Sequence, residues 1–463
     1  MKKISILGGG ISGTGAALLA KNKGYEVFVS DSAQIAEQYK QKLLAANISF
    51  EEETHSVERI LDTEEIVKSP GIPDTADIIV KAKEKGIKII SEIEFASRYT
   101  NAKLIAVTGS NGKTTTTLLI YHILKNSGFK VGVAGNIGES FAELVIKNEF
   151  DYYVLEVSSF QLDGMYDFKA DVSVLLNITP DHLDRYNNDF QQYVDSKMRL
   201  LQNQTKKDYF VFFSDDQVIR NEISKRSILP FKLGVSITDN ILNGGYLKED
   251  NLHFNVNNHF KTMMKLDNVI LPLHGKHNSV NTMAAVLASM AAGVTEEQVM
   301  ACISSFKNVP HRLEDTGMIN SVRFINDSKA TNVDATKYAI DSFDKPIIWI
   351  AGGVDKGNDY TQLEEIVYEK VKAVICLGKD NSKLKKAFEE KTETLLETDN
   401  MSEAVMLASE LAEKGDIILL SPSCASFDLF QNYEDRGEQF KKAVRALERK
   451  QRRFNMYNIF LSF

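Results

Sequence analysis

Residues 103–128 read KLIAVTGSNGKTTTTLLIYHILKNSG: an apolar run, a glycine-bearing loop and a helical pattern follow one another directly. Glycines let backbone N–H groups turn toward phosphate oxygens, and the N-terminus of the following helix favours negative charge. We expect Lys113 to reach the outer phosphates and Thr114 to hold Mg²⁺. The loop is shorter than the usual phosphate-binding pattern, because Val107 stands five residues before Gly112 where that pattern has glycine. A plain strand–helix turn is the alternative, but Gly-Lys-Thr in this setting favours a site for a nucleoside triphosphate.

A second glycine-bearing turn lies near the start of the chain. Residues 6–31, ILGGGISGTGAALLAKNKGYEVFVSD, carry Gly8-x-Gly10-x-x-Gly13, and Asp31 ends the next apolar run. This pattern suits any ligand whose diphosphate rests on a helix N-terminus, so by itself it also fits an NAD enzyme. A dehydrogenase, however, has little use for a second, triphosphate-type loop one domain later. The two turns together predict two nucleotides, one as energy source and one as a handle on the substrate.

Strand-like apolar runs alternate with helical patterns along most of the chain, which is typical of parallel β-α-β units. We expect three α/β domains: a Rossmann-like domain over 1–100, a central P-loop domain with a mostly parallel sheet over 101–308, and a second Rossmann-like domain over 309–463. Asn-rich alternating segments around 240–275 predict hairpins within the central domain. The last strand–helix alternation is expected to start at the run VRFINDS, at Val322.

Charge and cysteine content narrow the function classes. The formal net charge of the 463 residues is −8 and the pI is near 5.7, which argues against a general nucleic-acid binder. Cys302, Cys376 and Cys424 are scattered and form no CxxC pair, so neither a zinc site nor a disulfide framework is indicated. The sequence shows no signal-peptide pattern and no apolar run long enough to span a membrane. We expect a monomeric cytoplasmic protein without nucleic-acid or membrane partners.

Several stretches, which occur in order through all three predicted domains, resemble the Mur ligases, the ATP-dependent amide-bond ligases that build the peptide of bacterial cell-wall precursors. They are VTGSNGKTT (107–115), AGNIG (134–138), LEVSSFQL (155–162), NITPDHLDRY (177–186), SK (196–197), HGKHNSVN (274–281), PHR (310–312), NDSKATN (326–332) and SPSCASFDLFQNYEDRGEQF (421–440). The last two are similar to the D-glutamate-adding members of the family. The DNPR and DDYAHHP segments of other members are absent from the sequence.

The resemblance implies a reaction and its partners. It implies that ATP phosphorylates the carboxylate of UDP-N-acetylmuramoyl-L-alanine, and that the amine of D-glutamate attacks this acyl phosphate, leaving ADP and phosphate. Phosphoryl transfer depends on positioning and charge neutralisation, so cations are needed where these anionic groups meet. The resemblance further implies ATP and Mg²⁺ as cofactors, with two metal sites, and carbamylation of Lys197.

The resemblance also assigns site residues. The UDP-linked substrate is expected at Ile11, Ser12, Asp31, Ser32, Gly71 and Asn136. ATP is expected at Gly109, Ser110, Asn111, Gly112, Lys113, Thr114, Thr115, Asn278, Asn281, Arg312 and Asp327. D-glutamate is expected at Thr331, Lys356, Ser426, Phe427 and Tyr433, the last at a position where the family often has Phe. Metal ligands are expected at Thr114, Glu156, His182 and Lys197, and catalytic roles at Lys113, His182, Lys197 and Lys329.

Several of these residues also have a plain structural interpretation, among them Lys356, which could be a solvated loop lysine. Glu156 could end a strand in a pair, although an unpaired carboxylate inside an apolar run is costly and favours a role. His182 could cap a turn, and Lys197 could be an ordinary surface lysine. Asn278 and Asn281 could be helix-capping residues.

Three other functions stay open at this stage. One is another amide ligase, either a different amino-acid-adding Mur enzyme or a folylpolyglutamate synthetase, although the first glycine-rich domain disfavours the folate enzyme. The second is an NAD-binding oxidoreductase that uses the first glycine turn. The third is a non-catalytic nucleotide-binding regulator.

Overall fold

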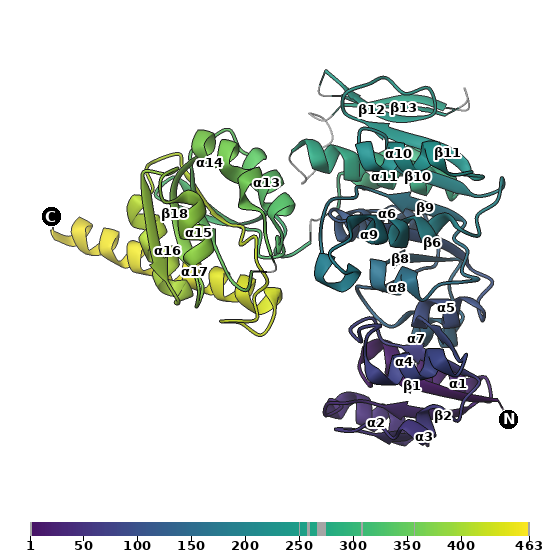
Figure 1. The fold of residues 1–463 in the computed structure, drawn as a ribbon. Helices are drawn as coiled ribbons and strands as arrows, with labels where there is room; N and C mark the ends of the chain where they lie inside the picture. The colour runs from purple at the N-terminus through teal and green to yellow at the C-terminus, as the bar shows by residue number, and fades with distance from the viewer. Residues whose placement is uncertain are drawn as a thin grey trace. The chain divides into compact units, whose positions relative to one another are not determined.

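The structure is a computed structural model, shown as a ribbon in Figure 1, and it describes residues 2–249, 251–256, 260–265, 275–306, 309–355 and 357–461. The chain forms two compact units. The first unit comprises Met1–Leu271 and Asn278–Phe306, and the second comprises Pro272–His277 and Lys307–Phe463. Each unit is described by itself below.

The first unit begins with a five-stranded parallel sheet in the order β3-β2-β1-β4-β5. Its strands are β1 (Lys3–Leu7), β2 (Glu26–Ser30), β3 (Ser49–Glu51), β4 (Glu65–Lys68) and β5 (Lys88–Ile90). Its helices are α1 (Ile11–Asn22), α2 (Glu37–Ala45), α3 (Val57–Ile60), α4 (Asp77–Glu84) and α5 (Glu92–Ser97). Ile4, Ile6 and Leu7 of the central strand β1 are all at most 1% exposed, because helices cover both faces of a parallel sheet.

The same unit contains a nine-stranded sheet in the order β14-β13-β12-β11-β10-β9-β6-β8-β7. Its strands are β6 (Lys103–Thr108), β7 (Val131–Gly135), β8 (Tyr152–Glu156), β9 (Val172–Leu175), β10 (Tyr209–Phe213), β11 (Phe231–Ser236), β12 (Gly244–Lys248), β13 (Asn251–Val256) and β14 (Phe260–Lys265). Strands β6 to β12 pair in parallel, and β12, β13 and β14 form antiparallel pairs. Over the described residues, this confirms the hairpins predicted from the Asn-rich segments.

The helices of this larger sheet include the two that carry the predicted nucleotide residues. They are α6 (Lys113–Asn126), α7 (Phe141–Lys147), α8 (Ser159–Asp163), α9 (Phe190–Met198), α10 (Gln217–Lys225), α11 (Lys276–Ala291) and α12 (Glu296–Ile303), with short 3₁₀ turns η1 (Leu183–Tyr186) and η2 (Arg199–Leu201). One hydrophobic core joins the two sheets of the unit, because Ala17 of α1, Phe95 of α5 and Phe141 of α7 belong to the same buried cluster.

The second unit is built on a six-stranded sheet in the order β15-β16-β20-β17-β18-β19. Its strands are β15 (Glu314–Ile319), β16 (Val322–Asn326), β17 (Ile347–Ala351), β18 (Val371–Leu377), β19 (Thr394–Thr398) and β20 (Ile417–Leu420). Its helices are α13 (Val333–Asp341), α14 (Glu364–Lys370), α15 (Ser382–Phe388), α16 (Met401–Leu411) and α17 (Tyr433–Leu461), with the 3₁₀ turn η3 (Tyr360–Leu363). Hydrophobic clusters cover both faces of this sheet.

The prediction that the last alternation starts at Val322 was wrong by one strand. Strand β15 precedes it and pairs antiparallel with β16 at the edge of the sheet. Its sequence EDTGMI contains a single buried residue, Ile319, because an edge strand with one covered face needs no continuous apolar run. The remaining pairs of the sheet are parallel, so the α/β class with three mostly parallel sheets is confirmed.

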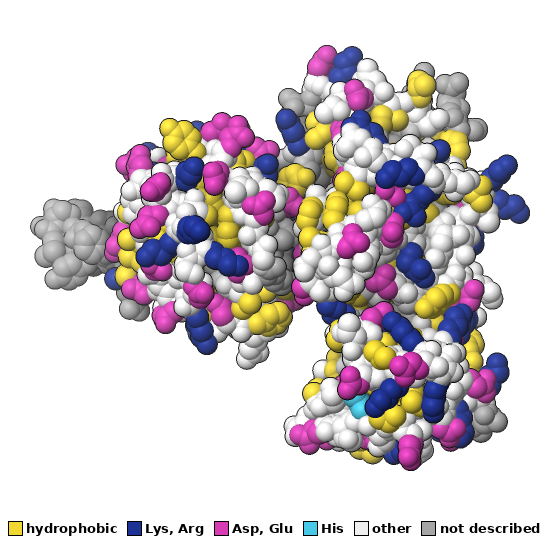
Figure 2. Space-filling model, viewed as in Figure 1, with side chains coloured by type: hydrophobic (Ala, Val, Ile, Leu, Met, Phe, Trp, Pro, Cys, Tyr) yellow, Lys and Arg dark blue, Asp and Glu magenta, His cyan; other side chains and the backbone are white. Residues whose placement is uncertain are grey.

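The described surface carries charges of both signs. On the face drawn in Figure 2, Lys and Arg (dark blue) are interspersed with Asp and Glu (magenta) over both units. None of the helices in the described part of the chain is long and apolar enough to cross a lipid bilayer.

Candidate functional site

The loop between β6 and α6 has the geometry of a phosphate cradle. Gly112 takes a left-handed conformation with φ of 83° and Lys113 is the first residue of the helix. A Cβ on Gly112 would lie 2.3 Å from Asn281 Oδ1, so no larger residue fits without moving that side chain. Lys113 Nζ donates hydrogen bonds to the carbonyl oxygens of Gly109 (2.8 Å) and Ser110 (2.9 Å). The amine therefore lies over the loop where phosphate would bind.

The other loop residues are held by the segment that follows β9, the neighbour of β6 in the sheet. The backbone N–H of Asn111 donates to Asn177 Oδ1 at 2.7 Å, and Ser110 Oγ donates to the carbonyl of Thr179 at 2.8 Å. Thr114 and Thr115 are buried in the first turn of α6. The loop is thus pre-formed by contacts within the first unit.

Asn278 and Asn281, in the first turns of α11, are buried next to this loop. Asn281 Nδ2 donates to Asn278 Oδ1 at 3.1 Å, and Asn281 lies against Gly112 as described above. The structure therefore brings both predicted ATP residues of α11 to the phosphate loop, although about 165 residues separate them in sequence from it.

Lys197 is the second amine at the loop. It lies in α9, is 1% exposed, and donates from Nζ to the carbonyl oxygen of Gly109 at 2.9 Å. Lys113 donates to the same carbonyl. Burial, and then the positive charge of Lys113, hold the pKa of Lys197 well below its ordinary value. Its interpretation as an ordinary surface lysine is wrong.

Glu156 ends strand β8, which lies beside β6 in the sheet. The side chain is buried, and Oε1 accepts a hydrogen bond from Asn136 Nδ2 at 3.0 Å. Oε2 is buried and has no hydrogen-bond partner among the described residues. An orphaned carboxylate oxygen is costly in a protein interior, so this oxygen could hold a cation.

His182 lies in a turn after β9, with a left-handed φ of 53°. Its Nε2 is 3.6 Å from Asp181 Oδ2, and its ring meets the ring of Phe160 edge-on at 5.2 Å between centroids. In the part of the chain that the structure describes, no three His, Cys, Asp or Glu side chains gather closely enough to hold a metal ion by themselves. A metal here would need oxygens from water or from a bound phosphate.

The glycine turn after β1 is closed by Asp31. Asp31 Oδ2 accepts from the backbone N–H of Gly9 at 2.7 Å, and Oδ1 accepts from Ala33 N–H at 2.9 Å. Three other residues predicted to bind UDP lie near this turn. Ile11 and Ser32 are exposed, and Ser12 is half-buried. The structure thus brings these four residues to one end of the first sheet, where the segment of Gly71 also lies because it follows β4, the parallel neighbour of β1.

Gly71 belongs to a separate segment that Arg185 of η1 holds. The Arg185 guanidinium donates to the carbonyl oxygens of Pro70 (3.4 Å), Gly71 (3.4 Å) and Ile72 (3.3 Å). It also lies over the Phe160 ring, 4.5 Å from its centroid. A cavity of about 760 Å³ lies beside this contact. Sequence reasoning missed Arg185, although it stands in the quoted motif NITPDHLDRY.

The second unit holds the remaining predicted residues. Asp327 follows β16 and is fully buried; its carboxylate accepts from Leu313 N–H (3.2 Å) and Ser421 Oγ (3.1 Å), and Arg312 Nη1 is 3.8 Å away. Burial raises the pKa of Asp327 to about 6. Lys329 Nζ lies 5.3 Å from the centroid of the Tyr433 ring. The structure therefore places Arg312 beside Asp327 and Lys329 beside Tyr433.

Of the residues predicted to bind the amino acid, Thr331 lies in the loop after β16, Ser426 and Phe427 lie in the loop after β20, and Tyr433 is the first residue of α17. Ser426 is 2% exposed, Phe427 is 72% exposed, and Thr331 is half-buried. Lys356 lies outside the described residues. These loops follow neighbouring strands of a parallel sheet, and ligands in such sheets bind at that edge.

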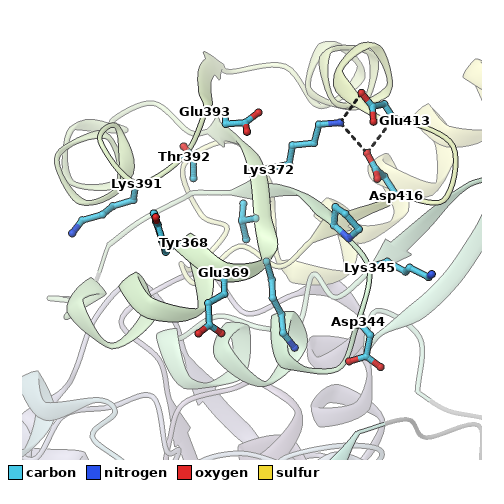
Figure 3. Close-up of a pocket in the computed structure, with 13 residues that line it drawn as sticks. Asp344, Lys345, Tyr368, Glu369, Lys372, Lys391, Thr392, Glu393, Glu413 and Asp416 are labelled. Carbon is cyan, nitrogen blue, oxygen red and sulfur yellow. Dashed lines mark hydrogen bonds and ion pairs between the residues drawn. The ribbon is translucent and has the colours of Figure 1, made fainter.

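A cavity at the opposite edge of the same sheet contains none of these residues. Figure 3 shows that Asp344, Lys372, Glu393 and Asp416 line it, at the amino ends of β17, β18, β19 and β20, and its volume is about 780 Å³. We assign it no role in the site, because the predicted residues gather at the carboxyl ends of the strands.

Comparisons with known proteins cover most of the chain. Family models match the MurD N-terminal domain at residues 3–78, the Mur ligase middle domain at 107–289, and the Mur ligase glutamate ligase domain at 311–424. A protein of Christiangramia forsetii named UDP-N-acetylmuramoylalanine–D-glutamate ligase is 51% identical over 446 residues, covering 96% of this chain and 100% of that protein.

Solved structures share the fold at lower identity. A pseudomurein peptide ligase type C from Methanothermus fervidus aligns with a TM-score of 0.63 and 20% identity, covering 96% of this chain and 100% of that one. A MurF ligase from Thermotoga maritima, in complex with ADP, aligns with a TM-score of 0.59 and 18% identity, covering 93% and 99%.

Proposed function

The chain belongs to the Mur ligase family, and from this premise we propose that it joins D-glutamate to UDP-N-acetylmuramoyl-L-alanine with ATP, in peptidoglycan precursor synthesis. The observation that carries this proposal is the 51% identity to a D-glutamate ligase over the whole length of that relative. The first glycine turn lies within a MurD N-terminal domain. We therefore interpret it as the handle for UDP and set aside the dehydrogenase, regulator and folate-enzyme alternatives.

We infer that ATP binds at the loop of residues 109–115. The supporting geometry is the left-handed Gly112, the helix N-terminus at Lys113, and the buried Asn278–Asn281 pair against the loop. Lys113 Nζ, which now donates to two loop carbonyls, would exchange these bonds for phosphate oxygens. A backbone cradle with a fixed cation stabilises the charge that develops during phosphoryl transfer without further reorganisation.

We propose that Mg²⁺ binds beside this loop, with Thr114 at one position and Glu156 and His182 at a second. The buried Glu156 Oε2 without a partner supports the second position, and carboxylate oxygen is a preferred ligand of this ion. When bound, Mg²⁺ would neutralise phosphate charge and polarise the transferred phosphoryl group. Asn136 fixes the orientation of Glu156 through Oε1, which leaves the other oxygen free to point at the ion.

We propose that Lys197 is carbamylated in the working enzyme. Only a neutral amine adds to CO₂; the N–C bond forms, one proton leaves the nitrogen, and a carbamate anion results. A lowered pKa makes the neutral amine available near neutral pH. The change gives the buried side chain beside Lys113 a negative charge, which attracts the Lys113 ammonium group and would supply oxygen atoms at the metal position.

We propose the bond-forming steps that the family resemblance implies. The carboxylate of the UDP-linked substrate attacks the γ-phosphorus of ATP, and ADP leaves. The amine of D-glutamate then attacks the acyl carbon, and phosphate leaves. Two carboxylates of D-glutamate need cationic and hydroxyl donors, and Thr331, Lys356, Ser426, Phe427 and Tyr433 are our candidates, with Arg312, Asp327 and Lys329 assigned to ATP and its phosphates.

The test is ATP-dependent phosphate release with UDP-N-acetylmuramoyl-L-alanine present, comparing D-glutamate with L-glutamate, L-alanine, L-lysine and diaminopimelate. We expect release only with D-glutamate, and none from the Lys113→Met variant. Release with another amino acid would keep the family and refute the substrate. Size-exclusion chromatography of the same preparation with light scattering tests our expectation of a monomer. We also propose that the reaction takes place in the cytoplasm.

A further inference from the structure

Arg436 is a fully buried cation in the first turn of α17. It is 1% exposed, and its guanidinium makes four hydrogen bonds, all to neutral oxygens. Nε donates to Ser328 Oγ (3.0 Å) and Nη2 to the Ser328 carbonyl (2.8 Å). Nη1 donates to the carbonyls of Gly352 (3.3 Å) and Cys424 (3.1 Å). The predicted site residues do not include Arg436.

The acceptors of these bonds belong to three different loops. Ser328 follows β16, Gly352 follows β17 and Cys424 follows β20, and these three strands are neighbours in the order β16-β20-β17. The loops therefore meet at one edge of the sheet. Thr331 and Ser426, two of the proposed amino-acid ligands, stand three and two residues from the bonded positions.

Burying a guanidinium group costs free energy, because the cation loses its contact with water. Burial lowers the pKa of Arg436 to about 10, which reflects the cost of removing the cation from water. An apolar side chain of similar volume would avoid this cost. What an apolar side chain cannot do is set the spacing of three separate backbone segments, because only the planar fork of arginine offers five donors in fixed directions.

We propose that Arg436 is a positioning residue for the amino-acid substrate: it holds the three loops at the spacing that the two carboxylates of D-glutamate require. This inference rests on the proposed function of the second unit. Asp327, the proposed ATP ligand of this unit, accepts its hydrogen bonds from Leu313 N–H and Ser421 Oγ, whereas the Arg436 guanidinium acts on it only through its charge. Loss of Arg436 is therefore expected to affect D-glutamate more than ATP.

The experiment compares Arg436→Lys and Arg436→Ala with the wild type by phosphate release, titrating D-glutamate, ATP and the UDP-linked substrate separately. We expect kcat/KM for D-glutamate to fall about 100-fold in both variants, since a displacement of roughly 1 Å is enough for a loss of that size. We expect the KM values for ATP and the UDP-linked substrate to stay within about threefold. In Arg436→Ala, guanidinium chloride at millimolar concentration is expected to restore part of the D-glutamate activity, and sodium chloride is not.

A matched control is available at the other edge of the same sheet. Lys372 Nζ lies 3.2 Å from Glu413 Oε1 and 3.5 Å from Asp416 Oδ2, as the dashed lines of Figure 3 indicate. Lys372→Met removes a paired cation from the second unit without touching the three loops. We expect its KM for D-glutamate to equal that of the wild type even where its melting temperature is lower. Trp349, the single tryptophan of the chain, lies in β17 and reports by fluorescence that the second unit of each variant is folded.

The outcomes separate the inference from the function on which it rests. If the wild type releases no phosphate with D-glutamate, the proposed function fails. If the wild type is active and Arg436→Lys raises all three KM values equally, or lowers only the melting temperature, Arg436 has a purely structural role and the inference is overturned.

Discussion

Glu92 lies in α5 and its carboxyl group is fully buried between the two sheets of the first unit. Oε1 accepts hydrogen bonds from Ser140 Oγ and from the backbone N–H of Ala142, both at 2.7 Å. Burial raises the pKa of Glu92 to about 7, against an ordinary value of 4.5. The hydrogen bonds favour the charged form but do not compensate for desolvation. The stability of the first unit should therefore depend on pH through this residue.

The sign and size of this dependence follow from linkage. Between pH 4.5 and about 7 the folded protein keeps a proton on Glu92 that the unfolded chain has lost, so stability falls as pH rises through this window and levels off above it. A difference of about 2.5 pH units at about 1.36 kcal/mol per unit amounts to about 3.4 kcal/mol. About 2.5 kcal/mol of this is lost between pH 5 and pH 8.

Glu92→Gln should remove this dependence, because an amide oxygen can accept the same two hydrogen bonds and carries no charge at any pH. We expect the free energy of unfolding of the variant, minus that of the wild type, to increase by about 2.5 kcal/mol from pH 5 to pH 8. Any constant effect of the amide cancels in this difference. The other titrating groups are the same in both proteins and cancel as well.

The assay is urea unfolding followed by far-UV circular dichroism at pH 5, 6, 7 and 8. Multi-domain chains do not unfold in one step, so the transition of the second unit is identified separately by the fluorescence of Trp349. The remaining transition, which is seen by circular dichroism and not by tryptophan fluorescence, belongs to the first unit. Its free energy of unfolding is compared between the variant and the wild type.

Glu94→Gln is the matched control on the same helix. Glu94 is also buried, but it pairs with Arg98 at 3.3 Å and accepts backbone N–H groups of Tyr166, Asp167 and Phe168. Its neutralisation should destabilise the first unit, because the charge-assisted hydrogen bonds to the carboxylate are weakened, although Arg98 keeps its pair with Glu65 at 2.7 Å. A difference between Glu92→Gln and the wild type that stays constant from pH 5 to pH 8 would refute the reasoning about Glu92.

Three further perturbations test the proposed site. Gly112→Ala should raise the KM for ATP at least tenfold, because its Cβ would lie 2.3 Å from Asn281 Oδ1 and the left-handed backbone costs about 1–2 kcal/mol. The control is Gly128→Ala at the other end of α6, where φ is 95° and the space around the Cβ is open. This control should leave the KM for ATP unchanged in the same titration. Lys197→Ala should lose about 100-fold in kcat and recover partly with acetate or formate, so unimpaired activity in this variant would contradict a carbamylated lysine. Arg185→Ala should raise the KM for the UDP-linked substrate about tenfold, since it frees three backbone carbonyls of the loop that carries the proposed UDP contact; an unchanged KM in steady-state kinetics would exclude this role.

Features that depend on neighbours in sequence could be predicted. The strand–loop–helix around Gly-Lys-Thr was predicted from an apolar run followed by a helical pattern, and the structure confirms it with β6, Gly112 and a helix that begins at Lys113. The hairpins after residue 240 followed from alternation in the same way. Strand β15 was missed because a polar edge strand carries no such pattern.

Features that depend on burial could not be predicted. Without the family resemblance, Lys197 is predicted to be an ordinary surface lysine, yet it is 1% exposed, and no role was predicted for Glu92, Arg185 or Arg436. The asparagines of α11 were assigned to the nucleotide only through the family resemblance. Their contact with the loop became visible only in the folded chain.

The sequence by itself determined the alternation of strands and helices apart from the polar edge strand β15, the α/β class, the strand–loop–helix at Gly112 and the family. Tertiary structure alone decided which charged groups lose water and which partners they meet. The reason is the distance along the sequence between interacting residues. Periodicity and turn chemistry act within a few residues. In contrast, the hydrogen bond from Arg436 to Ser328 joins residues 108 positions apart, and the bond between Ser140 and Glu92 joins residues 48 positions apart. Desolvation and hydrogen bonding at such separations exist only after the sheets have packed.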